Sequence, residues 1–176
     1  MLANIQNYSQ RIHAGKQVEH RILASLRKMG HKIENPTADE DKYDKIDGWW
    51  IDKHLKKYPV QVKFRQSGDD ILFELIKDID KKIEGRHMLS KAVLYLVADS
   101  SGKTRLLPTS QIKKKASELL NIALKDMDEQ PFKTRWSGAG WQMNLQIDRA
   151  GGQRKLVAYF DPKLFTVFAV WDINIH

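Results

Sequence analysis

The run KAVLYLVAD at residues 91–99 constrains the fold more than any other stretch of this chain. From Ala92 to Ala98 it is nearly continuously apolar, as expected of a strand that is buried on both faces. A sheet with both faces covered normally has helices packed against it. The sequence therefore predicts an α/β (α+β) fold, in which a mixed sheet is flanked by helices.

Two segments have the apolar spacing of helices that could cover such a sheet. The first runs from Gly15 to Gly30, and its apolar positions are Val18, Ile22, Leu23, Leu26 and Met29. The second follows Pro108, and its buried stripe is Ile112, Ala116, Leu119, Leu120, Ala123 and Met127. A third, short helix is predicted over residues 76–85, where isoleucines recur at positions 76, 79 and 83.

The strands expected beside these helices fall into two groups. Short strands are predicted near residues 31–34, 47–51, 59–66 and 71–76, and the first strands in this series should pair antiparallel in succession. Residues 35–45 are polar and acidic, which predicts a surface loop. From Pro131 onward the apolar residues alternate with period two, which predicts a β-rich tail, with SGAG and RAGG as turns. The tail is expected to pack on the same core, so that residues 1–176 form a single domain.

The composition limits the kinds of partner, metal ligand and cellular location that we expect for this protein. The chain has 41% hydrophobic and 30% charged residues, which is typical of a globular protein. No apolar run reaches the roughly 18 residues of a membrane span, and no signal peptide is apparent, so we expect a cytoplasmic protein without membrane association. It has no cysteine, so any metal must be held by oxygen or imidazole, and its six histidines are not spaced as ligands. A net charge of +8 favours a polyanionic partner.

Four polar residues stand out against the apolar pattern. Glu19 borders the apolar stripe of the first helix, Asp47 begins a strand, and Gln61 and Lys63 share one face of the strand at residues 59–66. Phosphodiester cleavage requires a divalent cation with oxygen ligands, together with a group that positions the attacking water. These side chains could supply both.

This order of residues resembles the PD-(D/E)XK nuclease superfamily. The stretches AGKQVEHRILASLRKMGHKI, KIDGWW and YPVQVKFRQ are similar in order and spacing to archaeal Holliday junction resolvases. The similarity covers about residues 14–66. It implies a restriction-endonuclease-like αβββαβ core over residues 10–100, with residues 101–176 as a C-terminal helix and a β-rich elaboration packed on that core.

The resemblance also implies roles for individual residues. Asp47 would be the principal ligand of Mg²⁺ or Mn²⁺, joined by the Gln61 side-chain oxygen and the carbonyl of Val62. Glu19 would hold a second metal or a bridging water, and Lys63 would position the attacking water and help to deprotonate it. Further residues are expected to contact nucleic acid, namely Arg65, Gln66, Lys16, Lys133 and Arg135.

Gln61 departs from the family pattern, in which Glu or Asp is usual. A neutral amide oxygen still coordinates metal, but the loss of one negative charge should weaken cation binding. The nuclease subunit of certain heteromeric transposases resembles this Gln-x-Lys arrangement. Asp44 is an alternative to Asp47, and Glu74 could be an extra ligand if its strand pairs beside residues 59–64.

The function expected from the resemblance is that of a magnesium-dependent endonuclease that hydrolyses DNA, acts as a homodimer, and is junction-resolvase-like or restriction-like. Two alternatives remain open. The chain could bind nucleic acid with a degenerate, inactive nuclease core, or it could be an interaction protein with no nucleic-acid partner. The stretch RWSGAGW at residues 135–141 is either a DNA-contacting loop or a hairpin whose two tryptophans pair across its strands.

Overall fold

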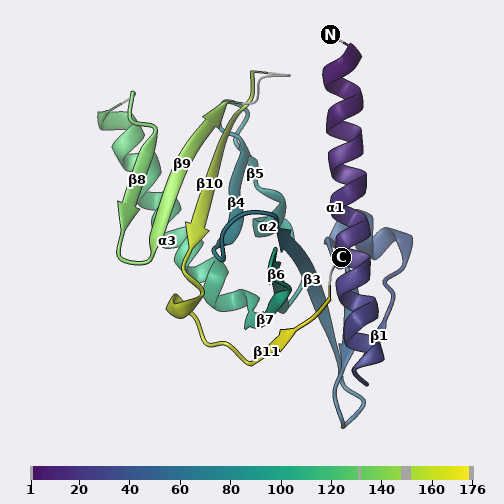
Figure 1. Cartoon of the computed structure of the whole chain (residues 1–176). Helices are drawn as coiled ribbons and strands as arrows, with labels where there is room; N and C mark the ends of the chain where they lie inside the picture. Colours follow the sequence, from purple (N-terminus) through teal and green to yellow (C-terminus); the bar gives the residue numbers. More distant parts are fainter. Residues whose placement is uncertain (1, 131, 148–151, 175–176) are drawn as a thin grey trace.

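The structure is a computed structural model that describes residues 2–130, 132–147 and 152–174, and for residues 2–14 the backbone alone. Two β-sheets and two long helices make up most of the described chain, which confirms the α/β (α+β) class (Figure 1).

The first sheet has the strand order β1-β2-β3-β6-β7-β11. All of its neighbours are antiparallel except β3 and β6, which are parallel. Its strands are β1 (Lys32–Glu34), β2 (Gly48–Ile51), β3 (Lys57–Arg65), β6 (Leu94–Asp99), β7 (Lys103–Pro108) and β11 (Ala169–Asp172). The expected antiparallel succession is therefore present in β1, β2 and β3.

The second sheet is antiparallel throughout and has the order β5-β4-β10-β9-β8. Its strands are β4 (Ile71–Asp78), β5 (Ile83–Glu84), β8 (Arg135–Gly138), β9 (Trp141–Ile147) and β10 (Arg154–Phe160). The tail thus shares a sheet with two strands from the first half of the chain, because β10 pairs with β4.

Three α-helices accompany the sheets, namely α1 (Leu2–Lys28), α2 (Arg86–Leu89) and α3 (Thr109–Glu129). A five-residue π-helix, η1 (Glu40–Asp44), interrupts the predicted loop, and a 3₁₀ turn, η2 (Pro162–Leu164), precedes β11. In Figure 1, α1 lies on one side of the molecule, while α3 and β8 lie on the other.

Strand β6 is buried on both faces, as the apolar run predicts. Tyr95 and Val97 belong to a core shared with α3 and the second sheet, whereas Leu96 and Ala98 belong to a core beneath α1. The first sheet is therefore the middle layer of the molecule, and β6 is the strand through which both cores meet.

The structure corrects the prediction for residues 71–85. Strand β4 continues to Asp78 and is followed by a turn and β5, so the predicted helix over residues 76–85 is wrong. Pairing with β10 and β5 extends the strand, and this long-range pairing outweighs a weak local pattern. The condition set for Glu74 is not met, because β4 pairs with β10 and β5 and not beside β3.

Three smaller differences concern element ends and pairing. Helix α1 begins at Leu2, ahead of the expected start at Gly15. In the β-rich tail, η2 occupies residues 162–164, and the last strand, β11, covers only Ala169–Asp172. RWSGAGW forms the predicted hairpin, but Trp136 faces Met143 and Trp141 faces Gly138, so the two tryptophans are not cross-strand partners.

No helix in the described ranges has both the length and the apolar character needed to cross a bilayer.

Candidate metal-dependent active site

Asp47 lies next to Gly48, the residue at which the pairing of β2 with β3 ends. The register of the two strands ends at Gly48 opposite Val60, and the Asp47 backbone N–H donates to the carbonyl of Val60 at 2.8 Å. Beyond that point the Asp47 side chain replaces the missing strand, because its Oδ2 accepts the N–H of Val62 at 2.7 Å. Since the N–H and C=O of one strand residue face the same neighbour, the Val62 carbonyl lies on this edge too.

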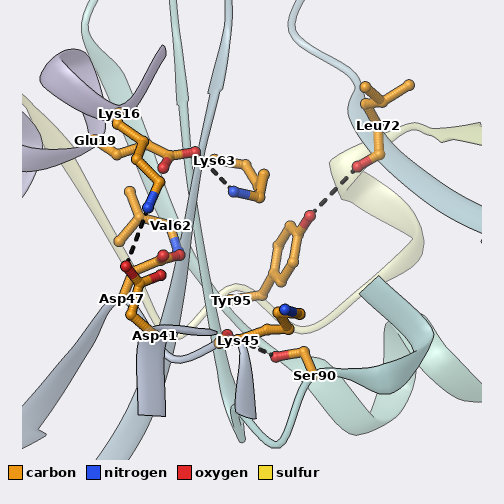
Figure 2. Close-up of polar contacts among 10 residues, drawn as sticks. All are labelled: Lys16, Glu19, Asp41, Lys45, Asp47, Val62, Lys63, Leu72, Ser90 and Tyr95. Carbon is orange, nitrogen blue, oxygen red and sulfur yellow. Dashed lines mark hydrogen bonds and ion pairs between the residues drawn. The ribbon is translucent and has the colours of Figure 1, made fainter. Parts of the chain in front are cut away.

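Lys63 and Glu19 meet at the same open edge. Val62 packs under α1, so Lys63 starts on the opposite face of β3, and its side chain reaches round the edge where β2 has ended. Its Nζ lies 2.7 Å from Oε1 of Glu19 on α1, and the side chains are 20% and 15% exposed. Figure 2 shows the two groups pointing toward each other, with Asp47 beside the main chain of Val62.

The environment of Glu19 opposes its negative charge. Burial is the largest cause that raises the pKa of Glu19, and the neighbouring charge of Asp47 raises it further, whereas Lys63 and Arg86 oppose the increase. Two carboxylates are thus held close enough to repel each other. Such a pair is costly unless a cation neutralises it, and Lys63 supplies part of that neutralisation.

Gln61 is the most deeply buried of the polar side chains predicted for the site, with 1% of its surface exposed. It lies two positions before Lys63 on the same face of β3, opposite Tyr95 of β6 in the register. In the described part of the chain its Oε1 has no hydrogen-bond partner. A buried amide oxygen without a partner costs free energy, so it needs a compensating role.

Two buried aromatic side chains form the inner side of the site. Tyr95 is fully buried and its hydroxyl donates to the carbonyl of Leu72 at 3.3 Å. Burial raises the pKa of Tyr95 well above its ordinary value, and Asp47 and Glu19 add to this effect. Burial lowers the pKa of His87 well below its ordinary value, and Lys63 and Arg86 add to that effect. His87 is therefore neutral at physiological pH, and its Nδ1 accepts the N–H of Glu74 at 2.7 Å.

Glu74, which was a possible extra ligand only if its strand paired beside residues 59–64, has a different position and task. Its strand lies in the second sheet, and its Oε1 accepts the backbone N–H of Arg86 at 2.8 Å. Asp44, the alternative to Asp47, lies 2.8 Å from the ammonium of Lys91. In the described part of the chain neither carboxylate forms a hydrogen bond or ion pair with Glu19 or Lys63, whereas the charge of Asp47 acts on Glu19, so Asp47 is the better candidate.

A cavity of about 230 Å³ opens beside the two carboxylates. Its lining combines acidic, basic and uncharged side chains from α1, from residues 35–41 and from Asp47. Lys16 lies at this cavity and pairs with Asp41 at 3.0 Å (Figure 2). Because Lys16 is exposed and close to Glu19, its predicted contact with nucleic acid remains compatible with its position.

The other residues predicted to bind nucleic acid are dispersed. Arg65 lies 2.7 Å from Asp70 and stacks over Tyr159 at 5.5 Å from the ring centroid, and Gln66 is exposed just after β3. Lys133 pairs with an aspartate of α3, and Arg135 is exposed on β8. Figure 1 places β8 on the side of the molecule away from α1, so these last two are not brought together with the site.

The donor set fits a hard divalent cation, although it is weakly charged. It offers carboxylates from Asp47 and Glu19, the unpaired oxygen of Gln61 and the carbonyl of Val62, all of which are oxygen ligands. Only two of these are carboxylates, and among the described residues no group of three or more His, Cys, Asp or Glu could hold a metal ion. Any cation here would depend on the amide oxygen as its third side-chain ligand.

Sequence reasoning missed Tyr95, His87 and Arg86 as neighbours of this site. The hydroxyl of Tyr95 is an exception within an otherwise apolar strand, which was a usable signal. Arg86 and His87 follow directly after residues 76–85, where the predicted helix was wrong, and no local pattern pointed to their position in α2.

Comparisons with family models, curated proteins and solved structures gave no match to this chain.

Proposed function

We propose that this protein is a metal-dependent endonuclease that hydrolyses phosphodiester bonds of DNA. One observation carries the proposal: Asp47 at the end of β2, Lys63 on β3 and Glu19 on α1 converge at the open edge of β3, half-buried and in mutual electrostatic contact. Half-buried charged groups that gather from separate elements and perturb each other are typical of functional sites.

Each residue has a task in such a reaction. Asp47, Gln61, Glu19 and the carbonyl of Val62 would hold Mg²⁺ or Mn²⁺, which when bound supplies charge neutralisation of the phosphate and a lower pKa for an attacking water. Lys63 orients that water and stabilises negative charge near the phosphate. Glu19 keeps the ammonium of Lys63 in position through their 2.7 Å ion pair.

The alternative function, nucleic-acid binding without cleavage, is favoured by two observations. Gln61 takes the position where the resembling family has a carboxylate, and the ammonium of Lys63 is already paired with Glu19. Both features would weaken metal binding or withdraw the lysine from the water. The basic composition of the chain suits either function.

The decisive experiment incubates the protein with linear duplex, branched and single-stranded DNA in Mg²⁺, in Mn²⁺ and in EDTA. We expect metal-dependent cleavage that Lys63→Ala abolishes. Lys57→Ala is the matched control, because it removes the same charge from an exposed position on the same strand. Cleavage that persists in Lys63→Ala at the wild-type rate, or none on any substrate, contradicts the proposal.

The Gln61→Glu variant separates the two functions. If the wild-type site binds metal, Mn²⁺ raises the melting temperature of both proteins, and more strongly for the variant, which has one more carboxylate. A metal effect confined to Gln61→Glu would support the degenerate core.

DNA as substrate, a homodimer and a cytoplasmic location belong to the same proposal, and sedimentation with and without DNA tests the oligomeric state.

A further inference from the structure

The short helix α2 is fixed to β4 by two hydrogen bonds that run in opposite directions. The backbone N–H of Glu74 donates to Nδ1 of His87, while the Glu74 carboxylate accepts the backbone N–H of Arg86. The ring of His87 is buried and packs against Phe73 at 5.2 Å and against Tyr95 at 6.0 Å between ring centroids. These contacts therefore fix the first residue of α2 more firmly than the internal hydrogen bonds of a four-residue helix could.

This anchoring carries Arg86 to the candidate active site. His87 contacts Tyr95, and Tyr95 is the register neighbour of Gln61, so the first turn of α2 lies against the face that bears Gln61 and Lys63. The charge of Arg86 also acts on Glu19, because it opposes the increase in the pKa of that carboxyl. Arg86 is thus a second cation near the carboxylates, supplied by a different element from Lys63.

The side chain of Arg86 is available for a ligand. It is exposed, and among the described residues its guanidinium has no hydrogen-bond or ion-pair partner. Among the other described arginines, Arg27 is engaged with Asn35, and Arg65, Arg105 and Arg154 each with an aspartate. Arg21 on α1 and Arg135 on β8 are exposed like Arg86, but neither lies on the face that bears Gln61 and Lys63. A firmly held backbone that presents an unpaired guanidinium beside a metal-site candidate suits recognition of an anion.

We propose that Arg86 binds a backbone phosphate of the DNA strand that enters the Asp47–Lys63 site. This inference rests on the proposed function and adds a residue to it. A guanidinium offers two parallel N–H donors to phosphate oxygens, so it fixes both the position and the orientation of the phosphate group. Lys63 and Arg86 then hold the strand from two elements, while the carboxylates of Asp47 and Glu19 are left to the cation.

The test measures DNA affinity at several salt concentrations in EDTA, where cleavage cannot interfere. For Arg86→Ala we expect about tenfold weaker binding and a salt slope smaller by about 1, as for the loss of one phosphate contact. Arg86→Lys retains the charge and should keep the slope but cleave more slowly in Mn²⁺. Lys125→Ala, which removes an exposed charge from α3, is the control and should change neither quantity.

The outcomes distinguish this inference from the proposed function. If the wild-type protein cleaves DNA but Arg86→Ala behaves like Lys125→Ala in slope and rate, the role of Arg86 is refuted and the nuclease proposal stands. If the slope decreases in Arg86→Ala but no protein cleaves, Arg86 binds phosphate and the nuclease proposal fails. If the wild-type protein does not bind DNA at all, both are overturned. Equal melting temperatures of wild type and Arg86→Ala confirm that the exposed substitution leaves the fold intact.

Discussion

The unpaired oxygen of Gln61 leads to a quantitative prediction. Methionine has the length and shape of glutamine without its polar atoms, so Gln61→Met removes the unsatisfied oxygen and leaves the volume of the buried site nearly unchanged. A buried polar group without a partner costs about 1–3 kcal/mol, and the substitution should recover that amount. For a chain of this size each kcal/mol shifts the melting temperature by about 2–4 °C. We therefore expect Gln61→Met to melt about 2–12 °C above wild type without metal.

Adding metal should narrow the difference in stability between the two proteins, and reverse it if the buried oxygen costs no more than the lower end of that range. If Gln61 contributes a ligand, a cation at about 100 times its Kd stabilises the wild-type protein by about 2.7 kcal/mol, and Gln61→Met gains less. Calorimetry in EDTA and in increasing Mn²⁺ measures both effects. Gln17→Met, at an exposed position of α1, is the control and should remain within about 0.5 kcal/mol of wild type.

The reasoning is refuted if Gln61→Met is destabilised in EDTA by more than about 1 kcal/mol. That result would mean that the amide oxygen is satisfied in the folded protein and that Gln61 has a structural role. A stabilised variant that responds to Mn²⁺ like the wild-type protein would confirm the cost of the buried amide but exclude it as a ligand.

Three further predictions concern single residues. Gly15→Ala should raise the free energy of unfolding by about 1 kcal/mol, because the added Cβ meets no atom within 4 Å in a helical position; a decrease in urea unfolding would contradict this. The pKa of Glu19 is raised in the folded state, so its contribution to stability is lost as pH rises above about 4.5. As pH rises from about 4.5 to about 7, the free energy of unfolding of Glu19→Gln should therefore increase relative to that of wild type, as measured by urea unfolding. A relative decrease over that range would show that the ion pair with Lys63 dominates. Glu74→Ala should lower the free energy of unfolding by about 1–2 kcal/mol, and Glu74→Gln should lower it less, because the amide oxygen still accepts the N–H of Arg86. Equal decreases for the two variants in thermal unfolding would be inconsistent with this hydrogen bond.

Much of the first sheet was predictable because its signals are local. The apolar run of β6 predicts burial on both faces, and the structure places its residues in both cores. In β3 the face opposite Gln61 and Lys63 carries Val60, Val62 and Phe64, which pack in the core beneath α1. The position of β4 was not predictable, because pairing with β10 joins residues more than 75 positions apart and leaves no local mark. The helix predicted over residues 76–85 failed for the same reason.

The candidate site was predictable only as a set of residues. Asp47, Lys63 and Glu19 were selected by type and order, and the structure brings them together. Their geometry depends on where β2 ends, since the open edge of β3 lets Lys63 reach α1. Arg86 could not be selected, because its position depends on two hydrogen bonds to Glu74 in the other sheet.

The pairing of β10 with β4 means that the chain cannot be divided into an N-terminal core and a separable tail. Val157 of β10 lies opposite Glu74, the residue that positions α2. A product truncated before β10 would leave the edge of β4 unpaired and would remove Phe160, which packs against Phe73, and it would also loosen the support of Arg86. Any rearrangement of the chain, by recombination or by design, must therefore keep these two distant segments together.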